Sequence, residues 1–109
     1  MAIKVFWTNF AKEQLSNIFD YYKTKANQRT ARDLVTGIVE KTKTLEFQKE
    51  AGQKEELLLS RKENFRYLIY KNYKIIYWFN TEKNRIEIND IFDTRQNPVK
   101  MIDETRNTE

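Results

Sequence analysis

The chain of 109 residues contains neither cysteine nor histidine. Without cysteine it can form no disulfide, no thiolate nucleophile and no cysteine-ligated metal site, and such a composition suits a reducing, cytoplasmic location. Without histidine it cannot assemble a Ser-His catalytic pair or bind zinc through imidazole. Catalysis, if the protein is an enzyme, has to use carboxylates, tyrosines, lysines and arginines, and we expect no metal and no cofactor.

Glycine and proline are also scarce, with Gly37, Gly52 and Pro98 as their only occurrences. A phosphate-binding loop needs several glycines close together and a proline-rich recognition segment needs several prolines, so both are excluded. The longest unbroken apolar run, residues 75–79, is too short to cross a membrane or to form the core of a signal peptide. We therefore expect no membrane partner.

The composition nevertheless predicts a folded protein. Apolar residues form 39% and aromatic residues 14% of the chain, which is enough to build a core despite 33% charged residues. A length of 109 residues matches one ordinary domain. We expect residues 1–109 to form a single domain that ends in a polar tail over about residues 103–109.

Positive charge is concentrated in one part of the sequence. The whole chain has a net charge of +4, but residues 58–86 alone carry seven basic and two acidic residues, a local charge of +5. Aromatic residues are interleaved with the basic ones, as in surfaces that bind RNA or acidic proteins. Strands whose alternate residues are simply solvated would give the same pattern. The seven basic residues are Arg61, Lys62, Arg66, Lys71, Lys74, Lys83 and Arg85.

The first half of the chain predicts a short strand followed by two helices. Residues 3–7 are mostly β-branched or aromatic and predict a strand, and Thr8 then suits a helix N-cap. Apolar residues recur at helical spacing up to about Lys25 and again from Ala31 onward. The short break predicts an antiparallel helical hairpin over about residues 9–47. Its apolar faces contain Leu15, Ile18, Leu34 and Ile38.

The second half of the chain predicts three consecutive strands. Residues 65–70 and 73–79 are rich in aromatic and β-branched residues, and residues 85–92 supply a third strand. Between the first two strands lies Lys71-Asn72, where asparagine tolerates the positive φ of a tight hairpin. The remaining expectations are a loop over residues 47–54, a possible extra strand at Leu57–Leu59, and a short helix from Asn97-Pro98 to about Ile102.

The order strand, helix, helix, strand, strand, strand predicts an α+β fold. We expect an N-terminal strand, an antiparallel helical hairpin packed on one face of a small antiparallel sheet, and a short C-terminal helix. Both faces of the strands carry large residues. The face opposite the helices is therefore expected to form a shallow aromatic and basic groove unless another segment covers it.

Six short strings stand in an order that is typical of one family: Trp7 with Ala11, Tyr21-Tyr22, Gly52, Phe65-Arg66, Asn72 to Tyr77, and Asp93 to Pro98. On these strings, and on the order of its elements, the chain resembles the toxins of the RelE/ParE superfamily. The resemblance covers about residues 3–102.

This resemblance implies the toxin of a type II toxin-antitoxin system, also called a plasmid stabilisation system, that a cognate antitoxin holds inactive. ParE-like members bind and poison DNA gyrase, whereas RelE-like members cut mRNA on the ribosome. DNA gyrase and the ribosome with its mRNA are therefore alternative targets. A third alternative is an attenuated member that binds only its antitoxin. The resemblance also leaves open a homodimer or a hetero-oligomer with the antitoxin.

The residues at the RelE-like catalytic positions favour the ParE-like alternative. In the RelE pattern, two basic residues on one strand match Arg66 and Leu68. Two further basic residues match Lys74 and Arg95, and a C-terminal tyrosine lies nearest to Met101. Arg66, Lys74 and Arg95 would be catalytic only in a RelE-like protein, where they would stabilise charge on the phosphate. Leu68 cannot bind phosphate and Met101 cannot transfer a proton, so we expect a ParE-like toxin, and whether the protein is an enzyme stays open.

We predict that the basic and aromatic strands provide the binding surface for partners. Ordinary structural roles are alternatives for several of these residues. Tyr73 and Tyr77 lie on one strand face and would also suit the core, and Lys74 would suit a cap on the hairpin. Asp93 and Arg95 would suit an ion pair. The predicted surface consists of Arg61, Arg66, Tyr73, Lys74, Tyr77, Asp93 and Arg95.

Overall fold

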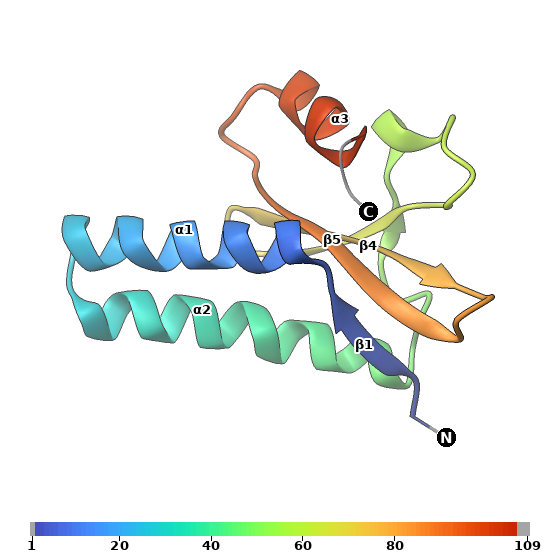
Figure 1. Ribbon diagram of the computed structural model, residues 1–109. Helices are drawn as coiled ribbons and strands as arrows, with labels where there is room; N and C mark the ends of the chain where they lie inside the picture. The colour runs from blue at the N-terminus through green and yellow to red at the C-terminus, as the bar shows by residue number, and fades with distance from the viewer. Residues whose placement is uncertain (1, 107–109) are drawn as a thin grey trace.

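A computed structural model describes residues 2–106 of the chain. Residues 107–109, the end of the expected polar tail, lie outside the described residues. None of the described helices is long and apolar enough to cross a membrane. In chain order the elements are β1 Lys4–Trp7, α1 Asn9–Lys25, α2 Gln28–Thr42, the 3-10 helix η1 Lys43–Glu46, β2 Gln53–Lys54, the 3-10 helix η2 Glu56–Leu58, β3 Arg66–Tyr70, β4 Tyr73–Asn80, β5 Arg85–Asp93 and α3 Pro98–Arg106 (Figure 1).

The strands form one sheet in the order β1-β5-β4-β3-β2. Neighbouring strands are antiparallel except β1 and β5, which are parallel, with Val5 opposite Ile86. The predicted antiparallel sheet is confirmed for β2 to β5, and the predicted N-terminal strand joins it parallel to β5. Parallel neighbours need a long crossover connection, and the helical hairpin together with the β3–β4 hairpin supplies it here (Figure 1).

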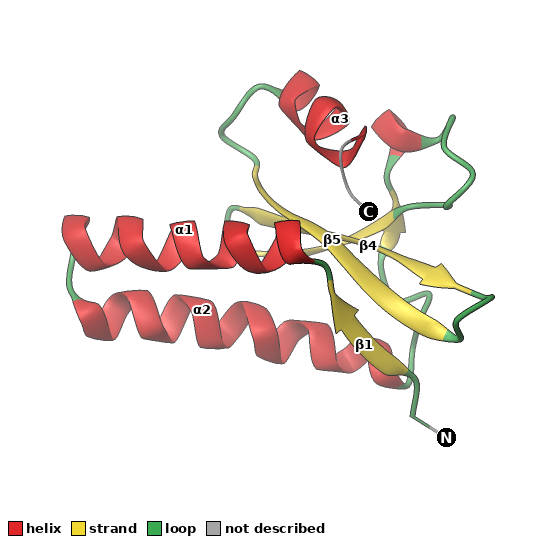
Figure 2. Ribbon diagram, viewed as in Figure 1, coloured by secondary structure: helices red, strands yellow, loops and turns green. Residues whose placement is uncertain are grey.

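Two capping side chains fix the helical hairpin. Thr8 accepts a hydrogen bond from the Ala11 N–H at 3.1 Å, and its hydroxyl donates to the Ile88 carbonyl at 3.0 Å, which ties the start of α1 to β5. At the start of α2, the Asn27 side chain accepts from the Thr30 N–H at 2.8 Å. The predicted hairpin and its Thr8 cap are confirmed, and the two helices lie side by side (Figure 2).

The helical hairpin covers one face of the sheet and forms the larger core. Leu34 and Ile38 are buried as predicted, whereas Leu15 and Ile18 pack against the core and remain partly exposed. The chain leaves α2 for η1, whose Leu45 is fully buried, so the predicted second helix consists of an α-helix and a 3-10 turn. The strands contribute Leu68, Tyr73, Ile75, Tyr77, Ile86, Ile88 and Ile91 to this core.

The opposite face of the sheet is partly covered by α3 and η2 (Figure 1). Met101 of α3 and Leu58 of η2 are buried against Phe65, Ile76 and Phe92. This second, smaller core fills part of the groove that the sequence predicted on this face. The C-terminal helix is confirmed, and it extends beyond the predicted end into the expected tail.

Residues 57–59 do not form the predicted extra strand. Glu55 accepts a hydrogen bond from the Leu57 N–H at 3.2 Å and so caps the helical turn η2. The short strand β2 precedes this turn, inside the segment predicted to be a loop, and pairs Gln53 with Tyr67. The prediction failed here because both the pairing and the turn depend on contacts that a local pattern does not contain.

The hairpin between β3 and β4 turns at Lys71-Asn72 as predicted, but the positive φ of 53° belongs to Lys71 and not to Asn72. The Asn72 carbonyl instead accepts hydrogen bonds from the N–H and the hydroxyl of Thr94, both at 2.9 Å. These bonds join the hairpin turn to the end of β5.

Candidate functional site

A pocket of about 420 Å³ lies between α1 and the segment that follows β5. Tyr21, on the α1 side, is 52% exposed. Amide, hydroxyl, guanidinium and ammonium groups share this pocket, which suits a polar or acidic partner. Its lining consists of Gln14, Asn17, Ile18, Tyr21, Tyr73, Ile91, Asp93, Arg95, Gln96 and Lys100.

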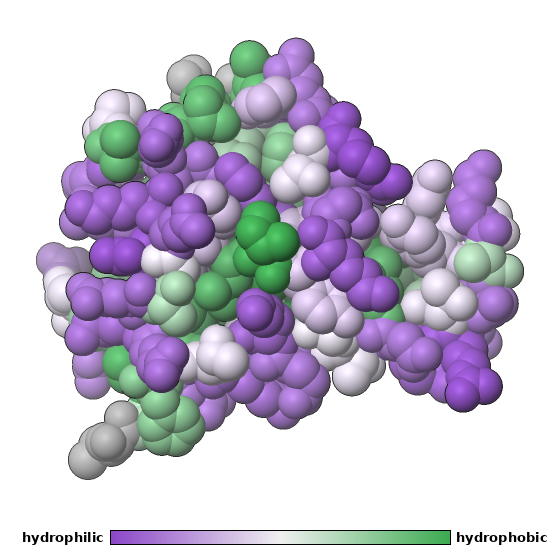
Figure 3. Space-filling model, turned by 180° about the vertical axis from the view of Figure 1, so that it is seen from behind, coloured by the Kyte–Doolittle hydropathy of each residue, from purple (hydrophilic) through white to green (hydrophobic). Residues whose placement is uncertain are grey.

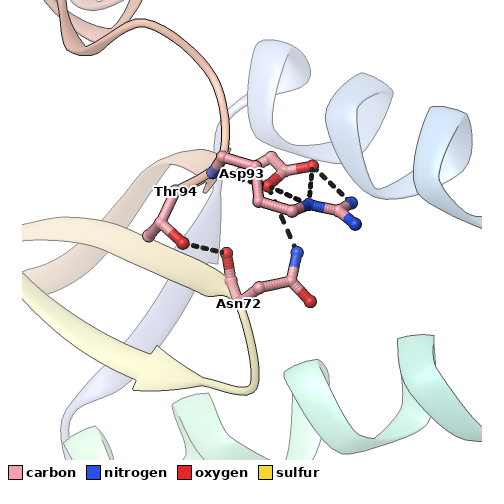
Figure 4. Close-up of polar contacts among 4 residues, drawn as sticks. Asn72, Asp93 and Thr94 are labelled. Carbon is pink, nitrogen blue, oxygen red and sulfur yellow. Dashed lines mark hydrogen bonds and ion pairs between the residues drawn. The ribbon is translucent and has the colours of Figure 1, made fainter.

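Asp93 is the centre of a polar network at this pocket (Figure 4). Its carboxylate accepts hydrogen bonds from the Arg95 Nε at 3.0 and 3.2 Å and from the Arg95 Nη2 at 2.7 Å. The Asn72 amide donates to the same carboxylate at 3.2 Å. The ion pair that the sequence offered as an alternative role for Asp93 and Arg95 is therefore present.

The pKa values of Asp93, Arg95 and Tyr73 are shifted at this pocket. Hydrogen bonds from Arg95 hold the pKa of Asp93 below its ordinary value of 3.8, and the Asp93 carboxylate raises the pKa of Arg95. Burial, together with a hydrogen bond involving Tyr22, raises the pKa of Tyr73. At neutral pH, Arg95 keeps its charge and Tyr73 keeps its proton. These side chains therefore suit binding better than proton transfer.

Arg66 lies in a second pocket, of about 580 Å³. Its Nη1 donates to the Gly52 carbonyl at 2.8 Å. The Tyr77 hydroxyl accepts from the Gly52 N–H at 2.9 Å and donates to the Lys49 carbonyl at 2.9 Å. Arg66 and Tyr77 thus hold the segment before β2 against the sheet. The second pocket is lined by Lys49, Glu50, Lys54, Lys62, Glu63, Asn64, Arg66, Trp78, Phe79 and Thr81.

Lys74 lies on the face that carries the smaller core. Its Nζ is 2.9 Å from Oε1 of Glu55, whose side chain is only 3% exposed, and 4.2 Å from the centre of the Tyr67 ring. Lys74 therefore anchors the segment before η2, and the alternative that it caps the hairpin was wrong. Arg61 also has an internal partner, because its Nη2 donates to the Ile102 carbonyl of α3 at 3.1 Å.

The three cations of the RelE-like set do not meet at one place. Arg66 is opposite Tyr77 of the larger core, whereas Lys74 contacts Tyr67 of the smaller core, so these two side chains leave opposite faces of the sheet. Arg95 lies in the first pocket, whereas Arg66 lies in the second. In the described part of the chain, no group of three or more acidic side chains could hold a metal ion.

Tyr73 and Tyr77 were predicted on the binding surface, but they are only 4% and 0% exposed. Both belong to the larger core, so the prediction of a binding role was wrong for Tyr77 and leaves Tyr73 as a pocket wall. Glu55 and Asn72, which hold Lys74 and Asp93, were not predicted as site residues. Asn72 belongs to the Lys71-Asn72 turn that the sequence predicted, whereas no sequence pattern links Glu55 to Lys74.

The described residues form a helical hairpin on one face of a five-stranded sheet. The chain matches a solved structure described as the chromosomal ParDE TA system from P. aeruginosa, with a TM-score of 0.70 and 22% identity over 84% of this chain and 96% of that chain. No curated protein matches. The family described as "ParE toxin of type II toxin-antitoxin system, parDE" matches residues 5–98. The chain therefore belongs to the ParE toxin family.

Proposed function

We propose that the protein is a ParE-like toxin that binds and poisons DNA gyrase, and that a cognate antitoxin neutralises it. Membership of the ParE toxin family over residues 5–98 supports the toxin activity. The description of the structural relative as a ParDE TA system supports an antitoxin partner.

The separation of the three cations is the observation that favours gyrase over mRNA. Metal-free RNA cleavage needs cations and proton-transfer groups that converge on one phosphate. Arg66, Lys74 and Arg95 instead occupy three different places, and each is engaged by a group of the same chain. The two remaining RelE-like positions, Leu68 and Met101, are 8% and 1% exposed. A toxin that acts by binding gyrase needs none of this convergence.

The rim of the first pocket is the surface that we propose for the target. Lys100 adds positive charge there, Arg95 presents a guanidinium paired with Asp93, and Tyr21 adds an exposed aromatic ring. Tyrosine and arginine are the residue types that most often dominate the binding energy of a protein interface. The Asp93 carboxylate holds the Arg95 side chain in one orientation before any partner arrives, which lowers the entropic cost of binding.

A supercoiling assay with purified gyrase tests the proposal. We expect the protein to inhibit supercoiling and Arg95→Ala to weaken the inhibition about tenfold, the equivalent of about 1.4 kcal/mol. Arg32→Ala is the matched control, because Arg32 is an exposed arginine of α2 that lies outside both pockets. Inhibition that is equally strong in both variants would contradict the role of the pocket rim, and absence of inhibition would contradict the gyrase target.

Transcript ends mapped shortly after induction test the mRNA alternative. Cuts in phase with ribosome-occupied codons, abolished by Arg66→Ala, Lys74→Ala or Arg95→Ala, would replace the proposal with a RelE-like nuclease. Growth arrest with intact transcripts and signs of DNA damage is the expected result. Neither effect, in a protein that still binds its antitoxin, would indicate an attenuated member.

Co-expression with the product of the neighbouring reading frame tests the antitoxin. We expect the two proteins to purify together and their affinity to fall as salt rises, because residues 58–86 carry a local charge of +5. Failure of the two proteins to bind each other at low salt would contradict the proposal that this neighbour is the antitoxin.

A further inference from the structure

The edge of the sheet at β3 is only half covered. β2 pairs with Arg66 and Tyr67, and in the structure of residues 2–106 no strand lies beside residues 68–70 on that side. An unpaired edge presents main-chain donors and acceptors to any extended segment that reaches it.

The alternation of hydrogen bonds identifies the residue that presents these groups. Tyr70 and Tyr73 close a two-residue hairpin and therefore form a hydrogen-bonded pair. Every second residue of β3 then points its N–H and C=O toward β4, so those of Leu68 face Ile75. The N–H and C=O of Ile69 point the other way, toward the uncovered edge. The Ile69 side chain is 47% exposed.

The chain leaves this edge at Gly52. If β2 were longer and stayed in register, Gly52 and Ala51 would cover the edge as far as Ile69. Instead, the Gly52 N–H donates to the buried Tyr77 hydroxyl, and the Gly52 carbonyl accepts from Arg66. These two bonds hold Gly52 against side chains of the larger-core face, and the pairing of β2 ends at Gln53 and Tyr67.

The open stretch lacks the usual protection of a sheet edge. Natural edge strands are protected by prolines, charged residues or bulges, and residues 68–70 are Leu, Ile and Tyr in regular register with β4. Seen from behind, the surface is largely hydrophilic, with apolar side chains gathered near its middle (Figure 3). Among the described residues, the exposed large apolar side chains are Tyr21, Phe47, Leu57, Leu59, Ile69 and Val99.

Positive charge around the open edge favours an acidic segment as its partner. The β3–β4 hairpin contains three basic residues and no acidic one, and β2 adds the exposed Lys54. Glu55 already neutralises Lys74, which leaves Lys54 and Lys71 near the two ends of the open stretch. A second copy of this chain would bring like charges together. An acidic segment would instead place opposite charges beside both lysines.

We propose that the open edge of β3, centred on Ile69, binds an extended acidic segment of a partner protein as an added β-strand. The Ile69 main chain supplies a donor and an acceptor, and Lys54 and Lys71 favour acidic residues in the partner. This inference rests on the proposed function only in expecting a partner, because the edge and its charge are properties of this chain alone.

The test uses the full-length protein and a short synthetic peptide in which glutamate alternates with valine. Nuclear magnetic resonance follows the chemical shift and hydrogen exchange of the Ile69 amide. We expect the acidic peptide to bind and to slow this exchange. A peptide with lysine in place of glutamate should bind about tenfold more weakly or worse. The acidic peptide N-methylated at alternate residues loses main-chain donors and should weaken to a similar degree.

Two variants of Ile69 test the protein side of the contact. Ile69→Pro removes the outward N–H without removing a hydrogen bond to β4, whereas Ile69→Val keeps the N–H and a similar side chain. We expect Ile69→Pro to lose peptide binding and Ile69→Val to retain it. If Ile69→Pro does not fold, the comparison of the N-methylated with the unmodified peptide decides the question on the unaltered protein.

Several results would overturn the proposal. These are absence of binding, equal binding of the N-methylated and unmodified peptides, and binding that leaves exchange at Ile69 unchanged. A concentration-dependent dimer that slows exchange at Ile69 would overturn the choice of an acidic segment over a second copy. Failure of the peptide would leave the gyrase and antitoxin assays unaffected, so the two proposals fail separately.

Discussion

The two faces of the sheet carry hydrophobic cores of different size. On one face, α1 and α2, of 17 and 15 residues, bury a core cluster that includes Ile38 and Ile75. On the other face, α3 and η2, of 9 and 3 residues, bury a smaller core around Met101. Because stabilisation grows with the apolar area removed from water, we infer that the helix face supplies most of the stability.

The largest expected effect is on the helix face. Ile38 is fully buried between α2 and the strands. Ile38→Ala removes apolar contacts and leaves a cavity that the surrounding helices cannot close, so the free energy of unfolding should fall by about 2–5 kcal/mol. Denaturant unfolding measures this change. A loss below about 0.5 kcal/mol, typical of surface sites, would remove Ile38 from the core and contradict the comparison of the two faces.

The matching change on the other face is Met101→Ala. Met101 is 1% exposed, but it belongs to a short C-terminal helix, which we expect to separate from the sheet without global unfolding. We therefore expect a loss of about 1–2 kcal/mol, less than a buried truncation costs in a rigid core. Hydrogen exchange should accelerate in α3 and η2 and stay unchanged in α1. A loss as large as that of Ile38→Ala would show that both faces contribute equally.

A third prediction concerns the contact between α2 and β3. A Cβ at Gly37 would collide with the Tyr70 hydroxyl and ring, so the glycine lets Tyr70 of β3 lie across the helix. Gly37→Ala should destabilise by about 1–2 kcal/mol because overpacking outweighs the better helix propensity of alanine. Tyr70→Leu removes the obstacle. In that background Gly37→Ala should stabilise by up to about 1 kcal/mol, and an unchanged sign would contradict the contact.

The elements predicted well were those determined by local pattern. The periodic faces around Leu34 and Ile38 and the cap at Thr8 depend on residues three or four positions apart, and these features match the structure. The parallel pairing of β1 and the helical turn at Leu57 were missed. Both depend on contacts between distant segments, which periodicity does not encode.

The contacts of the candidate site also include some that local spacing predicts and some that it does not. Asp93 and Arg95 are two residues apart and leave the strand on one side, so their ion pair was visible in the sequence. Glu55 and Lys74 are 19 residues apart, and no spacing rule connects them. Whether a tyrosine is buried or exposed is hard to predict from sequence, because its ring is apolar and its hydroxyl is polar. For Tyr77 the fold resolves this by burying the ring and pairing the hydroxyl with Gly52.

The smallest expected effect is at the pocket rim, where Asp93 has a lowered pKa. A carboxyl whose pKa is lower in the folded than in the unfolded protein stabilises the fold above its unfolded pKa. That contribution disappears as the pH falls through the folded value, which for Asp93 lies below 3.8. Arg95 is 60% exposed, so solvent screening limits the contribution to about 1 kcal/mol or less. Asp93→Asn should therefore cost this amount at neutral pH and nothing in strong acid. In an Arg95→Ala background the same substitution should cost less at neutral pH, and a cost that persists unchanged into strong acid would assign the effect to packing rather than to charge.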